Sequence, residues 1–113
     1  DKLAAIAQLQ AKFGGTWLIK GATTLVHEHG LLHSCGLGNA GMATAGMGDC
    51  LSGVVAGLLA QQSILGLDYP LLSAVLIHAQ AGDRLAQQVG EYALSANAMS
   101  KAIGNVMQAL NLS

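Results

Sequence analysis

An acidic residue stands where a glycine-rich loop meets an apolar, helix-like segment. The loop reads GMATAGMGDC, Gly41 to Cys50, and Asp49 is its only charged residue. A glycine loop that leads into a helix presents unpaired backbone N–H groups in the first turn, where the helix dipole adds positive potential. Gly46 and Gly48 let the backbone approach a ligand and adopt positive φ. This arrangement suits the oxygens of a transferring phosphoryl group.

Asp49 has a chemical reason to occupy this position. The dipole keeps a first-turn carboxylate ionised, so Asp49 could accept a proton from a hydroxyl that attacks the phosphate. A purely structural role is the alternative interpretation, because aspartate is common in the first turns of helices and glycine loops often serve only to turn the chain. The spacing matches neither a P-loop, since no Gly-Lys-Ser/Thr follows, nor a GxGxxG loop after a strand. The loop alone leaves both interpretations open.

The composition restricts the class of protein. The chain has 113 residues, with 52% apolar and only 10% charged, well below the usual quarter. Such a chain has difficulty covering its surface with charge, so we expect a homo-oligomer or a piece of a larger protein. It also begins without methionine, inside an apparent helix.

Charge and apolar runs exclude two kinds of partner. The net charge is −1 and the five basic residues are scattered, which argues against nucleic-acid binding. The longest apolar run, Leu51 to Ala60, is shorter than the roughly 20 residues of a membrane span, so no membrane partner is expected. Cys35 and Cys50 lie in separate contexts, and we interpret them as reduced thiols of a cytoplasmic protein.

The periodicity predicts a helix, strands, the glycine loop and then three helices. Gly14 ends the first helix, and His29-Gly30 forms a tight turn between two hairpin strands. Asp68 is a candidate N-cap for the third helix, and either Ser95 or Asn97 caps the last. This order is typical of the closing half of a layered α/β domain. The expected helices are 1–13, 47–62, 68–89 and 95–110, and the expected strands are 16–20 (buried), 23–28 and 31–35.

Three stretches resemble one enzyme family. GNAGMATAGMGD, Gly38 to Asp49, closely resembles the signature of the ADP/ATP-dependent NAD(P)H-hydrate dehydratases of the ribokinase-like superfamily. LIKGATTLV, Leu18 to Val26, resembles the family's nucleotide-contacting segment, and LIHAQAGD, Leu76 to Asp83, resembles its later H-G-x-A-G-D helix. The three occur in the family's order. The resemblance implies a three-layer ribokinase-like α/β fold, with residues 1–113 as the C-terminal part of one dehydratase domain whose N-terminal part is absent.

The resemblance also implies an activity. The family dehydrates the S form of hydrated NADH or NADPH, using ADP or ATP as co-substrate. The hydroxyl is phosphorylated and phosphate is then eliminated. Mg²⁺ would accompany the nucleotide, bound mainly through phosphates and water, with no metal ligand assigned to the protein.

The resemblance also implies roles for individual residues, namely those that occupy the matching positions of the three motifs. Asp49 would meet the hydrated substrate and act as the base, and Asn39 would order the loop or the phosphate. Ala45 departs from the family's usual glycine and would be strained if its φ were positive, and Cys50 replaces a usual valine. Lys20, Gly21, Ala22, Thr23 and Thr24 would contact the nucleotide, and Gly46, Met47 and Gly48 would form the anion hole.

Other readings stay open. A ribokinase-like kinase of a small alcohol, such as a vitamin precursor, shares the glycine-acid core, although the GNAGM stretch favours the dehydratase. A non-catalytic nucleotide-binding homologue is the third possibility. We expect His78 to be a hydrogen-bonded packing residue and Asp83 to brace the loop. The zinc-ligand types His27, His29, His33 and Cys35 match no zinc signature, so we expect ordinary edge-strand histidines.

Overall fold

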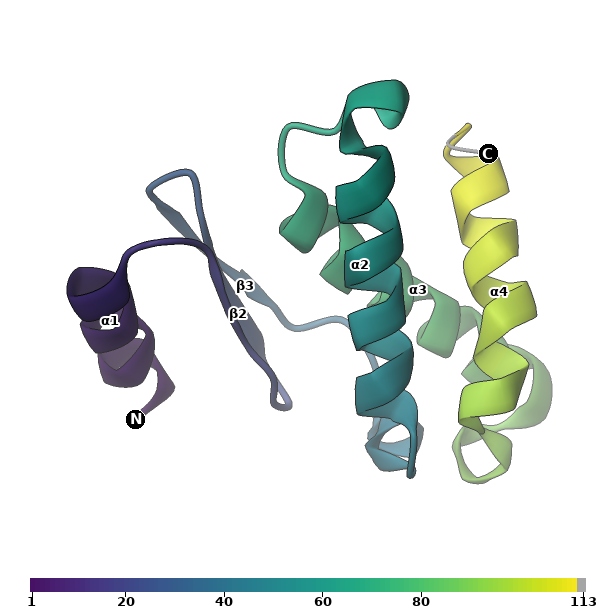
Figure 1. Cartoon of the computed structure of the whole chain (residues 1–113). Helices are drawn as coiled ribbons and strands as arrows, with labels where there is room; N and C mark the ends of the chain where they lie inside the picture. Colours follow the sequence, from purple (N-terminus) through teal and green to yellow (C-terminus); the bar gives the residue numbers. More distant parts are fainter. Residues whose placement is uncertain (112–113) are drawn as a thin grey trace.

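The computed structural model describes residues 1–111. It confirms an α/β chain in which one helix and a three-stranded sheet precede three further helices (Figure 1). The elements are α1 (Lys2–Phe13), β1 (Trp17–Ile19), β2 (Thr24–Glu28), β3 (Leu31–Cys35), the 3-10 turn η1 (Ala40–Ala43), α2 (Met47–Leu65), α3 (Pro70–Val89), the 3-10 turn η2 (Glu91–Ala93) and α4 (Ala96–Ala109).

The sheet is antiparallel, in the order β1-β2-β3. His29 and Gly30 form the predicted hairpin turn with φ of 53° and 75°, so both residues are left-handed, as hairpin turns of this kind require. Alternate residues of β2 face opposite sides, and the sheet therefore separates α1 from the other three helices (Figure 1). The strand 16–20 was predicted to be buried, but β1 is a half-buried edge strand.

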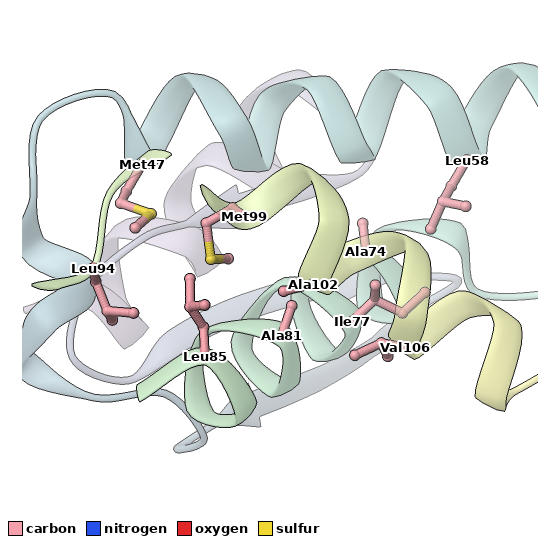
Figure 2. Packing of buried hydrophobic residues seen from close by; sticks show 10 residues of the cluster. All are labelled: Met47, Leu58, Ala74, Ile77, Ala81, Leu85, Leu94, Met99, Ala102 and Val106. Atoms are coloured by element: carbon pink, nitrogen blue, oxygen red, sulfur yellow. The ribbon is translucent and has the colours of Figure 1, made fainter. Parts of the chain in front are cut away.

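Two apolar clusters hold the helices to each other and to the sheet. The first fills the space between α2, α3 and α4 (Figure 2), and the second joins the sheet to α2 and α3. Met47, at the first turn of α2, belongs to the first cluster and is buried. The end of the glycine loop is thus fixed to the helical core. The second cluster contains Val26, Cys35, Leu51, Leu71, Val75 and Ala79.

The start of α3 differs from the prediction. Tyr69, not Asp68, is the N-cap residue, and its own side chain makes no capping bond. The buried carboxylate of Glu28 instead accepts hydrogen bonds from the N–H groups of Leu71 (2.9 Å) and Leu72 (3.1 Å). A carboxylate from β2 therefore caps a helix more than forty residues away, which local sequence patterns cannot predict.

The observed ends of the other helices agree more closely with those predicted from the sequence. Ser95, one of the two candidate caps, accepts a bond from the N–H of Ala98 at the start of α4. Helix α2 continues past Gln62 to Leu65, where Gly66 ends it in the left-handed conformation. Within residues 1–111 no single helix is long and apolar enough to cross a membrane; α2 and α3 pass that test only as a pair, bent by 120°.

Candidate functional site

A cavity of about 780 Å³ lies where the β1–β2 connection, the glycine loop and helices α2 and α3 meet. Its volume falls within the range of about 300–1,000 Å³ that is usual for small-molecule sites. All three stretches that carry the family resemblance, residues 18–26, 38–49 and 76–83, contribute to the lining. The lining residues are Lys20, Gly21, Ala22, Thr24, Cys35, Leu37, Gly38, Asn39, Ala40, Met42, Ala43, Thr44, Met47, Gly48, Leu51, Val75, His78 and Ala79.

Side-chain hydrogen bonds fix the first part of the glycine loop. Asp83 of α3 accepts from the N–H of Gly38 (3.0 Å) and from Nδ2 of Asn39 (2.9 Å). Oδ1 of Asn39 in turn accepts from the N–H of Gly41 (3.0 Å) and so caps η1. The prediction that Asp83 braces the loop is confirmed, and Asn39 orders it.

The second part of the loop contains backbone N–H groups that have no hydrogen-bond acceptor among residues 1–111. Gly46 is left-handed, with φ of 86°, and precedes the first turn of α2. The N–H of Met47 donates to the carbonyl of Thr44 (3.2 Å) and that of Cys50 to Gly46 (2.9 Å). Between them, the N–H groups of Gly48 and Asp49 have no acceptor among residues 1–111. These are free donors at the positive end of a 19-residue helix.

The side chain of Lys20 reaches this first turn. Its ammonium group lies against Gly48, in the space that a Cβ at position 48 would occupy. Only glycine therefore lets the ammonium approach the helix backbone. The free N–H groups and the Lys20 cation together form an anion-binding arrangement at the cavity wall.

His78 adds a second ionisable group without adding charge. Its side chain is buried, and its pKa is lowered from the usual 6.5 by burial and, to a smaller extent, by the nearby Lys20 cation; the backbone of Met47 opposes the shift. Lys20 is therefore the only charged side chain among the lining residues at neutral pH. The one charge on the lining itself is therefore positive, which suits an anionic ligand.

The model of the NAD(P)H-hydrate dehydratase family matches residues 1–105. The chain belongs to this family.

Named relatives agree with the family match. The bifunctional NAD(P)H-hydrate repair enzyme Nnr of Coxiella burnetii is 43% identical over 97 residues, which is 85% of this chain and 20% of that protein. The bifunctional repair enzyme of Leishmania major is 45% identical over 92 residues, 80% of this chain and 16% of its own length. The ADP-dependent (S)-NAD(P)H-hydrate dehydratase of Enterococcus faecalis is 37% identical over 112 residues, 94% of this chain and 35% of its own. The chain thus covers only about a fifth of the length of the Coxiella burnetii protein and about a third of that of the Enterococcus faecalis protein.

Within this family member, the structure gathers most of the predicted nucleotide residues at one cavity. Thr23 and Gly46 lie outside its lining, although Gly46 shapes the loop. Asp49 is exposed in the first turn of α2, outside the lining, and its carboxylate has no hydrogen-bond or ion-pair partner among residues 1–111. The predicted residues that do line the cavity are Lys20, Gly21, Ala22, Thr24, Asn39, Met47 and Gly48.

Ala45, the departure from the family's glycine, causes no backbone strain. Among residues 1–111 the only non-glycine residues with positive φ are His29 and Asn111. The left-handed position of the loop is Gly46 instead, where glycine is retained.

Sequence reasoning assigned His78 to packing and missed its place at the cavity. A signal was available, since His78 is a histidine within a run of apolar residues of α3 and is the titratable residue among the buried side chains of that helix. In the part of the chain described, no three His, Cys, Asp or Glu side chains are grouped so as to hold a metal ion, those of the hairpin included. His29 and His33 instead pack edge-on against Tyr69, with ring centroids 5.2 and 5.8 Å away.

Proposed function

We propose that this chain forms the nucleotide-binding part of an enzyme that converts (S)-NAD(P)H hydrate back to NAD(P)H, with ADP or ATP as the phosphoryl donor. The observation that supports this most directly is the meeting of Lys20, the free N–H group of Gly48 and the 780 Å³ cavity at the first turn of α2. The relative from Enterococcus faecalis, named an ADP-dependent (S)-NAD(P)H-hydrate dehydratase, supports the choice of reaction.

In the proposed mechanism the nucleotide occupies the cavity, contacted by residues 20–24. Its terminal phosphoryl group lies at the first turn of α2, where the free N–H groups of Gly48 and Asp49 and the Lys20 ammonium stabilise its charge. The hydrated nicotinamide approaches from the side of the loop on which Asp49 is exposed. Asp49 accepts the proton of the ring hydroxyl as it is phosphorylated. Loss of the phosphate from one ring carbon, together with loss of a proton from the adjacent carbon to water, then restores the double bond.

Mg²⁺ fits the proposal as a companion of the nucleotide. Mg²⁺ in such sites is held by substrate phosphates, waters and one or two carboxylates, and residues 1–111 offer no larger cluster of ligands. When bound, the ion neutralises phosphate charge. The residues of this chain contribute the surrounding donors and the ordering of the loop by Asn39.

The proposed function also requires a domain that is larger than this chain. We place residues 1–113 at the C-terminal part of a three-layer, ribokinase-like dehydratase domain, in which the remaining part supplies the other wall of the substrate pocket. The share of each relative that the chain covers supports this. A homo-oligomer would cover the weakly charged surface.

The test uses the full-length gene product. It is supplied with hydrated NADH, Mg²⁺ and either ADP or ATP, and the return of the near-ultraviolet absorbance of NADH is followed. We expect nucleotide-dependent recovery that Asp49→Ala abolishes. The matched control is Asp68→Ala, which removes an exposed aspartate from the α2–α3 connection and should leave the rate unchanged.

Two results would contradict the proposal. Nucleotide binding without any recovery of NADH would favour a kinase of a small alcohol. Recovery at the normal rate in Asp49→Ala would remove that residue from the mechanism.

A further inference from the structure

A second hollow of about 410 Å³ lies between α3 and α4, formed by residues with no part in the proposed reaction. Arg84 and Gln88, one turn apart, form the α3 wall. Asn97, Lys101 and Asn105, at successive turns, form the α4 wall. Leu85, Ala98 and Ala102 form the floor, where the two alanines leave space between the helices. We call this hollow the α3–α4 groove.

The charge in the groove is of one sign. Arg84 and Lys101 are two of only five basic residues in the chain, yet the fold brings both to one hollow. The groove lining includes no carboxylate, and neither cation has an ion-pair or hydrogen-bond partner among residues 1–111. Asp83, next to Arg84 in sequence, is directed to the glycine loop, where it accepts bonds from Gly38 and Asn39. Two neighbouring cations without a counter-charge favour a bound anion.

The polar groups of the groove narrow the class of anion. Gln88, Asn97 and Asn105 carry carboxamides, each of which both donates and accepts hydrogen bonds. A guanidinium and an ammonium bind phosphate oxygens, while carboxamides bind hydroxyl groups. From this set we infer that the α3–α4 groove binds a small phosphate monoester of a polyhydroxy compound, at a site separate from the nucleotide cavity.

The test measures binding of sorbitol 6-phosphate to the isotope-labelled protein by amide chemical shifts in NMR. We expect saturable shifts at residues of the groove that neutral sorbitol does not produce. The double variant Arg84→Gln/Lys101→Gln should weaken the binding about tenfold or more, because it removes both charged donors. Lys12→Gln, which removes an exposed cation from α1, is the matched control and should leave the affinity unchanged.

A third variant separates this inference from the proposed function. Lys20→Gln should weaken adenine nucleotide binding at the first cavity and leave the groove shifts intact. Shifts confined to the glycine loop, or lost in Lys20→Gln, would assign the phosphate to the nucleotide cavity and overturn the inference. Equal weakening by Lys12→Gln and by the double variant would overturn it as well, because the attraction would then be that of net charge alone.

Discussion

Asn39 and Asp83 are 44 positions apart, yet Nδ2 of Asn39 donates to Oδ1 of Asp83 at 2.9 Å. The second carboxylate oxygen accepts from the N–H of Gly38, and Nδ2 of Asn39 also donates to the carbonyl of Gly82. Helix α3 thus holds the start of the glycine loop before any ligand arrives. Asp83 is a positioning residue, since it acts on the ligand only through the loop.

Asp83→Asn should loosen the loop. One acceptor oxygen becomes a donor, so either Gly38 or Asn39 loses its partner, and we expect about 1–3 kcal/mol less stability. Nucleotide affinity should fall by about tenfold, because the donors of the loop are no longer preorganised. Urea unfolding and calorimetric titration with ADP would measure the two effects. Asp68→Asn is the control, and an equal loss in that variant would show that charge alone is responsible.

Glu28→Ala should destabilise the fold without a direct effect on the cavity. The carboxylate of Glu28 is 3% exposed and caps Leu71 and Leu72 at the start of α3. Removing it leaves one buried and one partly buried N–H group unpaired, which should cost about 2–4 kcal/mol of unfolding free energy. Glu28→Gln keeps one acceptor and should cost less.

Denaturant unfolding of these variants is compared with that of Glu91→Gln, an exposed acid in η2. That control should change stability by no more than about 0.5 kcal/mol. A Glu28→Ala protein as stable as the control would mean that water replaces the cap.

Gly41→Ala and Gly104→Ala should change stability in opposite directions. A Cβ at Gly41 would collide with the carbonyl oxygen of Glu91 and with Leu94, so η1 and η2 must move apart, at about 1–3 kcal/mol. Gly104 lies inside α4 with nothing within 4 Å of an added Cβ. Alanine there should stabilise by about 0.5–1 kcal/mol through helix propensity. Thermal unfolding of both variants would show the contrast, and the same sign for both would refute the packing argument.

Local sequence patterns correctly predicted helix ends and the hairpin turn, because these depend on the backbone preferences of a few neighbouring residues. Gly14 and Gly90 end helices where the prediction placed those ends, because glycine adopts positive φ without strain, and His29-Gly30 closes the hairpin. The nucleotide segment and the glycine loop were recognised from their residues, and the structure places most of both at one cavity.

Several features that depend on contacts between residues far apart in the sequence were not predicted. The cap of α3 comes from Glu28 on another element, so the nearby Asp68 was the wrong prediction. His78 was assigned to packing because one polar residue in an apolar stripe does not reveal which cavity it reaches. The exposure of Asp49 could not be predicted either, since the first turn of a helix can face the core or solvent.

His78 should make the stability of the fold depend on pH. Its pKa is lowered in the folded state, first by burial and then by Lys20, so below the usual value of 6.5 the unfolded chain binds a proton that the folded chain resists. Stability is therefore complete above that pH and decreases as the pH falls from 6.5 toward the folded pKa. His78→Gln, which does not titrate, should flatten this decrease. Urea unfolding from about pH 7.5 to 5.5 measures it.

His29→Asn provides the control for this prediction, because it removes an exposed histidine and asparagine tolerates the left-handed φ of 53° found there. That variant should keep the acid-induced loss of stability, since His78 is retained. If His78→Gln and the unmodified protein instead lost stability in parallel on acidification, the proton would bind elsewhere. The buried imidazole would then be excluded as the group that makes the stability of the fold depend on pH.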